Sequence, residues 1–158
     1  MKFLITGGGT GGHIYPALAI ANKIKERYKD AEILYIGTKH GMENELVPKE
    51  GFKFETIRVK GFQRKLSKDT FDTIKELFLG INDANRIVGE FKPDVVIGTG
   101  GYVCGPVVFV ASLKKIPTLI HEQNALPGVT NKILSKFVDK IAISFEESKK
   151  FFKNQKKI

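Results

Sequence analysis

The sequence has almost no cysteine, no long apolar run and no secretion signal. Cys104 is the only cysteine among 158 residues, so no internal disulfide can form. The longest apolar stretch, 107–113, is far shorter than the roughly 20 residues of a membrane-spanning helix. No signal-peptide pattern precedes the first apolar stretch at 3–5. We therefore expect a reducing, cytoplasmic setting, in which any membrane is met from outside.

The positive charge is concentrated in two short segments. Of a net charge of +9, residues 60–68 supply four cations and residues 149–158 supply five, and neither segment holds an acidic residue. No recognised nucleic-acid-binding motif accompanies this charge, so nucleic acid is not an expected partner. We expect the basic tail to be a loose, solvated chain end.

Strand-like and helical patterns alternate along the chain. Alternating or continuous short apolar runs predict strands, and apolar residues at helical spacing predict helices between them. No linker interrupts this order. We expect one α/β domain with a Rossmann-like, doubly wound parallel sheet of about six or seven strands and helices on both faces. The predicted strands are 2–6, 32–36, 53–59, 94–97, 118–120 and 140–143, and the predicted helices are 15–28, 42–49, 69–91, 105–113, 130–137 and 145–152.

Three unusual loops follow predicted strands. Residues 7–13, 98–106 and 121–128 come after the first, fourth and fifth strands. In open parallel sheets, ligands bind outside the carboxyl ends of the strands. The candidate site is therefore at the edge that these loops share.

The first loop partly matches two phosphate-binding patterns. Gly7, Gly9 and Gly12 satisfy G-x-G-x-x-G, but the second predicted strand ends without the acidic residue that would hold a ribose. His13 and Ile14 occupy the positions of the lysine and hydroxyl residue of a P-loop. Dinucleotides and nucleoside triphosphates are therefore disfavoured. The remaining prediction is an anion, most naturally a diphosphate, held by backbone N–H groups at a helix N-terminus.

The second loop repeats this chemistry. Gly98, Gly100, Gly101 and Gly105 surround Tyr102 after an apolar strand. Two such loops on neighbouring strand ends favour one extended, phosphate-bearing ligand. Tight turns that need glycine are the alternative interpretation.

Polar side chains add candidate chemistry to the loops. His13 stands at a helix N-terminus, where the dipole disfavours imidazolium, so the neutral ring is either a general base or a structural cap. His121, Glu122 and Asn124 suit sugar hydroxyls and amides, unless Glu122 pairs with a cation and Asn124 supports the turn. The sequence has no pattern of a hydrolase triad or a metal site.

A predicted amphipathic helix follows the first basic segment. Phe71, Ile74, Leu77, Phe78 and Ile81 share one face of it. This face either packs on the core or forms a peripheral membrane contact, with flanking cations that attract anionic lipid.

The chain resembles, in four successive segments, the N-terminal half of the MurG-type glycosyltransferases of peptidoglycan synthesis. These segments are GGGTGGHIYPALAIA, IGTKHGMENELVPKEGF, GTGGYVCGP and HEQNALPGVTNKILS. The resemblance implies the GT-B arrangement of two Rossmann-like domains. It also implies a hexosyltransferase that moves N-acetylglucosamine, with inversion, from UDP-N-acetylglucosamine to the muramyl 4-hydroxyl of lipid I, forming lipid II. Lipid I is an undecaprenyl-diphosphate-linked muramyl-pentapeptide, and the resemblance implies no metal or other cofactor.

Residue by residue, the resemblance implies three groups of contacts. The catalytic candidates are His13, as general base, and Glu122. The acceptor diphosphate and sugar would be bound by Gly8, Gly9, Thr10, Gly11, Gly12, Gly100, Gly101, Tyr102, His121, Asn124 and Asn131. Peripheral docking on the anionic cytoplasmic face of the bacterial plasma membrane would involve Lys60, Arg64, Lys65, Leu66, Lys68, Phe71, Ile74, Lys75, Leu77 and Phe78.

The chain departs from the family pattern at two points. Cys104 occupies a place usually held by serine, which puts a thiol near the site. The chain also ends at Ile158, before the family's donor-binding domain. We therefore expect 1–158 to be an N-terminal acceptor-binding domain that is inactive alone, with its own C-terminal domain as a partner. The alternatives are a naturally split half-transferase and a sugar-nucleotide epimerase of the same fold.

Overall fold

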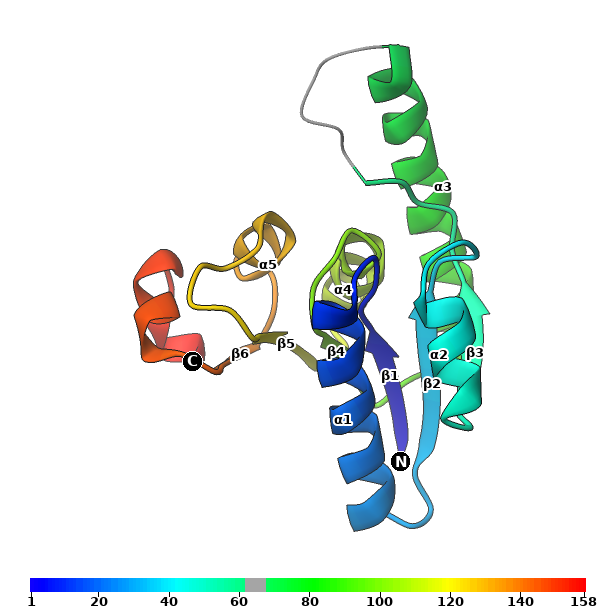
Figure 1. Cartoon of the computed structure of the whole chain (residues 1–158), viewed down its shortest axis with the longest axis horizontal. Coiled ribbons are helices and arrows are strands. Elements are labelled where there is room, and N and C mark those ends of the chain that lie inside the picture. The colour runs from blue at the N-terminus through cyan, green and yellow to red at the C-terminus, as the bar shows by residue number, and fades with distance from the viewer. Residues whose placement is uncertain (62–67) are drawn as a thin grey trace.

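A six-stranded parallel sheet forms the centre of the protein (Figure 1). The computed structural model describes residues 1–61 and 68–158, and the side chains of all of these except 68–72. Across the sheet the strand order is β3-β2-β1-β4-β5-β6, which confirms the predicted doubly wound fold. The strands are β1 (Lys2–Thr6), β2 (Glu32–Gly37), β3 (Lys53–Thr56), β4 (Val95–Gly98), β5 (Thr118–Glu122) and β6 (Lys140–Ile143).

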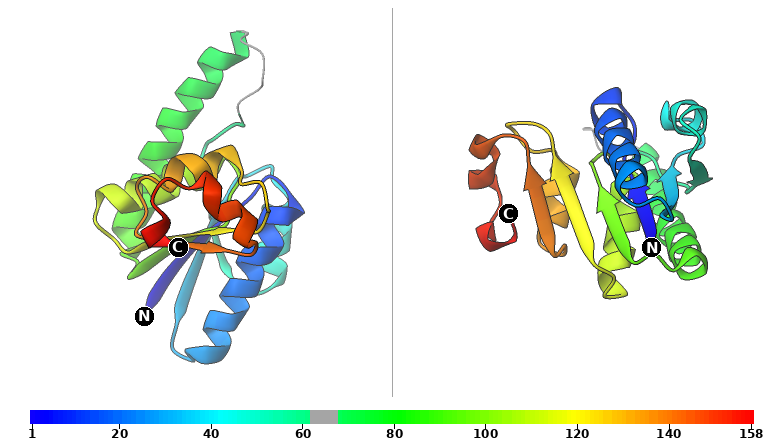
Figure 2. Two further views of the ribbon diagram at one scale, coloured as in Figure 1. Left: turned by 90° about the vertical axis from the view of Figure 1, so that its left-hand side faces the viewer. Right: turned by 90° about the horizontal axis from the view of Figure 1, so that it is seen from below.

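Helices cover both faces of the sheet, as Figure 2 shows. One face carries α1 (Gly11–Arg27) and α2 (Glu43–Lys49), and the other carries α3 (Lys68–Phe91), α4 (Cys104–Leu113) and α5 (Val129–Leu134). Successive strand side chains point to opposite faces, so Leu4 joins the core beneath α3 and α4, whereas Phe3 and Ile5 join the core beneath α1. Two short 3₁₀ helices, η1 (Glu146–Phe151) and η2 (Gln155–Lys157), follow β6.

Several predicted element boundaries are wrong for local reasons. The helix predicted from Tyr15 begins at Gly11, because Thr10 is the extended N-cap and its carbonyl accepts from Ile14 N at 3.2 Å. The strand predicted to reach residue 59 ends at Thr56, because the N–H of Arg58 donates to the carboxylate of Asp83 on α3 and not to the sheet. The helix predicted at 145–152 is the 3₁₀ helix η1.

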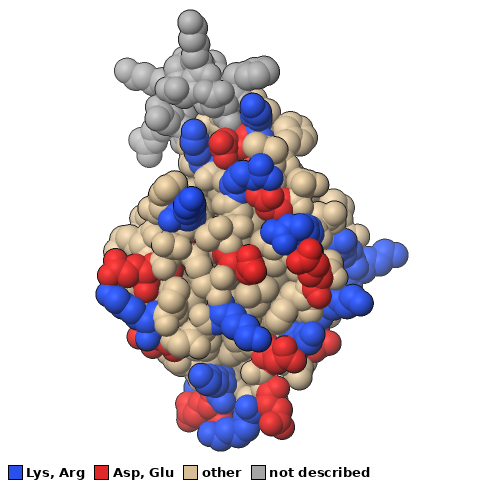
Figure 3. Space-filling view, turned by 90° about the vertical axis from the view of Figure 1, so that its right-hand side faces the viewer, with Lys and Arg blue, Asp and Glu red and all other residues tan. Residues whose placement is uncertain are grey.

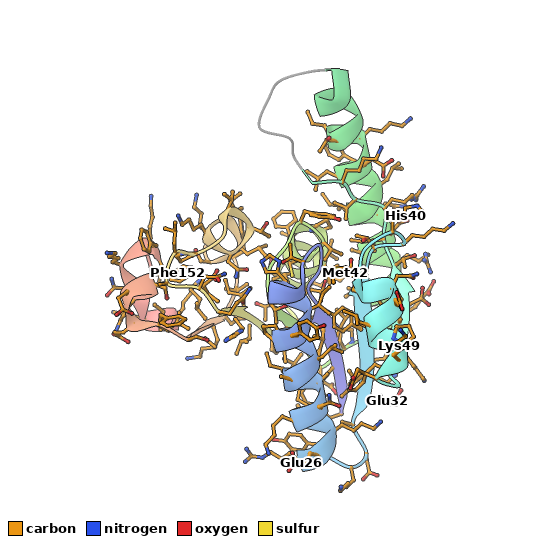
Figure 4. All side chains as sticks on the ribbon, viewed as in Figure 1. Glu26, Glu32, His40, Met42, Lys49 and Phe152 are labelled. Carbon is orange, nitrogen blue, oxygen red and sulfur yellow. The ribbon has the colours of Figure 1, made fainter. Side chains whose placement is uncertain are left out.

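The C-terminal tail is packed, so the expectation of a loose end is wrong. Phe152, labelled in Figure 4, is 2% exposed, and Ile158 packs against the same core. The ammonium group of Lys157 donates to the carbonyls of Ser135 and Lys136 at 3.3 and 3.2 Å, just beyond the end of α5. Cations at a helix C-terminus interact favourably with the exposed carbonyls there.

The long helix α3 is attached through its C-terminal half. A β-carbon on Gly80 would overlap the carbonyl oxygen of Arg58, so glycine lets the helix approach this backbone. Three donors of Arg58, its backbone N, Nε and Nη2, bond the carboxylate of Asp83 at 3.0, 2.8 and 2.7 Å. This pairing holds the pKa of Asp83 below its usual range. Figure 1 shows the other half of α3 extending beyond the sheet.

Charges of both signs are interspersed on the face shown in Figure 3. Lys and Arg side chains lie among Asp and Glu side chains there. Helical pairs such as Lys49 with Glu45 and Arg86 with Glu90 place opposite charges side by side on the protein surface. Among the described residues, this face therefore carries no continuous basic surface.

Candidate functional site

The candidate site lies at the switch point of the sheet. β1 and β4 are neighbours, but the chain passes from β1 to α1 on one face and from β4 to α4 on the other. Doubly wound folds form a ligand crevice where two adjacent strands diverge in this way. The two glycine-rich segments singled out in the sequence, 7–13 and 98–106, flank this point.

The two glycine-rich segments touch through their backbones. Gly8 N donates to Gly100 O at 3.3 Å, and a β-carbon on Gly101 would overlap the carbonyl oxygen of Gly8. Gly100 and Gly101 have φ angles of +110° and +83°, which favour glycine. The interpretation of this loop as a tight turn that needs glycine is therefore confirmed at both positions. The contact between the two segments also brings the N-termini of α1 and α4 together.

Both helices begin at this crevice without a side-chain cap. Neither the N-cap Thr10 of α1 nor the N-cap Val103 of α4 makes a side-chain capping hydrogen bond, and neither first turn contains an acidic residue. At α4 the N–H groups of Cys104 and Gly105 donate back to Gly101 O and Tyr102 O at 3.2 and 3.3 Å, so an anion there would meet the N–H groups that precede this helix. The dipole gives each helix start a partial positive charge. The crevice is thus suited to an anionic group that spans both helix ends.

His13 lies in the first turn of α1, beside the second loop. Its Nδ1 is 3.1 Å from Thr10 Oγ1 and 3.2 Å from the carbonyl oxygen of Gly8. The opposite edge of the ring lies beside Gly100, where a β-carbon would stand 3.0 Å from Nε2. The ring is therefore oriented through Nδ1 and lies at the junction of the two loops.

A buried carboxylate lies beneath the first loop and was missed by the sequence analysis. Glu43 is fully buried, and it accepts hydrogen bonds from Gly9 N at 3.3 Å, Thr38 N at 3.0 Å and Thr38 Oγ1 at 2.7 Å. It stands directly after Met42, which Figure 4 labels at the start of α2. The available signal was glycine at 37 and 41, where a β-carbon would overlap this side chain.

Tyr102 separates two cavities next to the loops. A β-carbon on Gly9 would be 3.0 Å from its ring, so the ring rests against the first loop. On one side lies a polar cavity of about 520 Å³ whose walls include Lys39, His40 and Lys60. On the other side lies an apolar groove of about 350 Å³ that Tyr102 and Lys60 also line.

Glu122 organises the third loop. It is 1% exposed, and its Oε1 accepts from the N and Nδ2 of Asn124 at 2.9 and 3.0 Å. Its Oε2 accepts from Gly128 N at 3.2 Å and from Asn131 Nδ2 at 2.9 Å. Asn131 is also buried, at 2% exposure. These three predicted site residues therefore come together, with their polar groups directed at one another.

His121 lies near the end of β5, directly before Glu122, in a half-buried position. Its Nε2 is 3.1 Å from Ser144 Oγ, which follows β6. Burial lowers the pKa of the imidazole, and the nearby Glu122 opposes that shift. In the described residues its Nδ1 is buried without a hydrogen-bond partner.

Cys104 belongs to the interior and does not line the crevice. The residue is fully buried, and its Sγ lies 3.1 Å from Thr6 O and 3.2 Å from Gly100 N. Desolvation raises the pKa of the thiol to about 12. The thiol expected near the site thus supports the glycine loop from below.

The predicted membrane-contact residues include exposed, half-buried and undescribed side chains. On α3, Ile74 and Phe78 are 42% and 68% exposed, whereas Leu77 is half-buried and lines the apolar groove. Lys60 and Lys75 are exposed. Arg64, Lys65 and Leu66, and the side chains of Lys68 and Phe71, lie outside the described residues. No helix in the described ranges is both long and apolar enough to cross a bilayer.

Comparison with known proteins identifies close relatives along the whole chain. The model for the glycosyltransferase family 28 N-terminal domain matches residues 3–143. The chain is 65% identical over 158 residues to the Thermoanaerobacter sp. (strain X514) protein named "UDP-N-acetylglucosamine--N-acetylmuramyl-(pentapeptide) pyrophosphoryl-undecaprenol N-acetylglucosamine transferase". All of this chain is aligned, but only 43% of that relative. The chain therefore spans less than half of the relative's length.

Solved structures support the same comparison. Acinetobacter baumannii MurG matches with a TM-score of 0.81 and 33% identity, over 93% of this chain and 42% of that one. The UDP-GlcNAc 2-epimerase from Neisseria meningitidis matches with a TM-score of 0.68 over 96% of this chain and 43% of that one, at 15% identity. The epimerase likeness shows a shared Rossmann-like GT-B fold alone.

Proposed function

The chain belongs to the glycosyltransferase family 28 N-terminal domains, and on this premise we propose that it is the acceptor-binding half of a GT-B transferase. The whole enzyme would move N-acetylglucosamine from UDP-N-acetylglucosamine to the 4-hydroxyl of the muramyl sugar in an undecaprenyl-diphosphate-linked muramyl-pentapeptide. The observation that carries the proposal is the meeting of two uncapped helix N-termini at the glycine loops. A C-terminal domain would supply most donor contacts.

The acceptor diphosphate would bind across the first turns of α1 and α4. Backbone N–H groups around Gly11 and Gly12 would face one phosphate, and those around Gly101 and Tyr102 the other, because both sets lie at helix starts. The N–H of Gly9 already donates to Glu43, so it is not part of this set. Glu43 would position the loop from beneath.

His13 would act as the general base on the acceptor hydroxyl. A carbonyl oxygen only accepts, so the contact with Gly8 O requires a proton on Nδ1, and in the neutral ring this leaves the lone pair on Nε2. Nε2 would take the proton as the 4-hydroxyl oxygen bonds to the anomeric carbon of the donor and the bond to UDP breaks. Attack on the face opposite the leaving group inverts that carbon.

Glu122 is assigned a positioning role in this proposal. Its two oxygens are already engaged by four N–H donors, three from its own loop and one from Asn131 on α5. His121 and the exposed Asn124 would then present the loop to the acceptor sugar, held in place by this carboxylate.

The domain would meet the membrane peripherally, at the cytoplasmic face. Exposed Ile74 and Phe78 lie on the part of α3 that extends beyond the sheet, with Lys75 between them. Apolar side chains with adjacent cations suit an anionic bilayer surface, which would be the source of the lipid-linked acceptor.

An amide chemical-shift titration of the labelled chain would test the acceptor assignment. A soluble short-chain lipid I analogue should give saturable shifts in 7–13, 98–102 and 121–131, and UDP-N-acetylglucosamine should give few. Tighter binding of UDP-N-acetylglucosamine at the glycine loops would contradict the assignment and favour epimerase-like chemistry.

A further inference from the structure

An apolar groove runs between the three helices that cover one face of the sheet. Its volume is about 350 Å³, within the range of small-ligand pockets. Each of these helices contributes apolar side chains to the groove. They include Leu77 and Ile81 on α3, Pro106 and Phe109 on α4, and Ile133 and Leu134 on α5, with Phe137 just after α5.

Parts of the groove wall remain exposed to solvent. Ile133 and Phe137 are 53% and 45% exposed, and Phe137 packs edge-on against Phe109 with ring centroids 5.2 Å apart. A recessed apolar surface with rigid aromatic walls indicates a binding groove. It differs from the membrane-contact side chains Ile74 and Phe78, since those project outward from α3.

The groove begins at the glycine loops. Tyr102 lines the groove while its ring rests against the first loop at Gly9. Lys60 lines both the groove and the polar cavity on the other side of Tyr102, so a cation stands at the boundary between them. Tyr102 therefore lies at the boundary between the crevice at the glycine loops and the apolar groove.

We propose that this groove binds the first isoprene units of the acceptor's polyprenyl chain. The inference rests on the proposed function, in which a diphosphate occupies the helix N-termini. In a prenyl diphosphate the apolar chain is bonded directly to a phosphate, which matches the sequence of surfaces from glycine loops to groove. Lys60 would pair with the diphosphate at the mouth. The groove is short, so the rest of a long chain would remain in the bilayer.

Gly105 offers a direct test, because it lines the groove and a β-carbon there would meet nothing within 4 Å. Gly105→Leu should fill the groove without disturbing the fold. Gly89→Leu, on the exposed side of α3, is the matched control, since a β-carbon there also meets nothing within 4 Å. The probes are geranyl diphosphate and inorganic diphosphate, titrated into the 158-residue chain.

The parent chain and Gly89→Leu should bind geranyl diphosphate at least about tenfold more tightly than inorganic diphosphate, because apolar surface leaves water. Gly105→Leu should lose this gain and keep its affinity for inorganic diphosphate. Equal affinities for the two probes in the parent, or an unchanged gain in Gly105→Leu, would overturn the groove assignment and leave the proposed function standing.

Two further arms separate the remaining explanations. If the chain binds neither probe nor the lipid I analogue, the proposed function fails and takes this inference with it. If Gly105→Leu weakens binding to anionic vesicles that contain no prenyl diphosphate, the groove serves bilayer lipid, and the assignment to the acceptor chain is wrong.

Discussion

The carbonyl oxygen of Gly8 fills the space that a β-carbon would need on Gly101. This contact joins the loop after β1 to the loop after β4, and it sets the distance between the N-termini of α1 and α4. The electrostatics of the crevice therefore depend on two residues that have no side chains.

Gly101→Ala should unfold more easily than the parent chain by about 2–5 kcal/mol. The substitution places a side chain at a left-handed φ of +83°, which costs about 1–2 kcal/mol, and adds a methyl group that overlaps Gly8, which costs about 1–3 kcal/mol. Urea unfolding measures the difference. Gly89→Ala, in an open helical position, should be neutral or up to about 1 kcal/mol more stable. Equal stability of Gly101→Ala and the parent would contradict this packing.

Glu122→Gln tests whether this carboxylate positions the third loop. Each oxygen of Glu122 accepts hydrogen bonds from two N–H donors. In the glutamine variant an NH₂ group replaces one of these oxygens, so two N–H donors lose their acceptor and face another donor. We expect a loss of about 2–3 kcal/mol in the free energy of unfolding. Glu147→Gln, at an exposed position, should cost nothing measurable.

The result for Glu122→Gln also separates two roles. A fall in the activity of a full-length transferase that carries this domain, without loss of stability, would show Glu122 acting on substrate. The positioning role requires stability and activity to fall together.

The stability of the chain should decrease in mild acid because of His121. Burial lowers its folded-state pKa below the unfolded value of about 6.5, so the unfolded state binds more protons as the pH falls through that range. The contribution is fully present above about pH 6.5 and is lost as the pH falls towards the folded pKa. Urea midpoints for His121→Gln should vary less with pH between about 5 and 8 than those of the parent. The exposed His40→Gln serves as a control for replacing a histidine at the surface.

Phe78→Glu should weaken binding to anionic vesicles by at least about tenfold. The side chain is 68% exposed on α3, and the substitution removes an apolar contact while adding a charge that anionic lipid repels. Vesicle co-sedimentation measures the binding. Tyr28→Glu makes a similar change at an exposed position at the opposite end of the sheet, and it should bind as the parent does. Equal loss in both variants would indicate a general charge effect.

The sequence predicts the sheet and the glycine loops because both depend on local patterns. Short continuous apolar runs mark β1 and β2, and parallel strands bring their carboxyl ends to one edge whatever the details of packing. The clustering of Gly8 with Gly100 follows from that topology.

Other features depend on tertiary contacts that no local pattern records. Glu43 lies in a polar stretch typical of an exposed helix start, and only the neighbouring backbone shows it to be buried. On α3, Leu77 and Phe78 are both apolar and adjacent, and the position of α4 decides which lines a groove and which meets solvent. The basic tail packs because the side chain of Phe152 is buried in the core.

Chemical modification of the buried Cys104 thiol would report local opening of the chain. It is the only thiol in the sequence, it is fully buried, and its sulfur bonds both Thr6 and Gly100. An alkylating reagent can reach it only after the loop above it separates from β1, so the rate of modification counts these separations. A ligand that binds across the two loops should slow the modification. Its binding could therefore be followed through the natural thiol, with no label added to the protein.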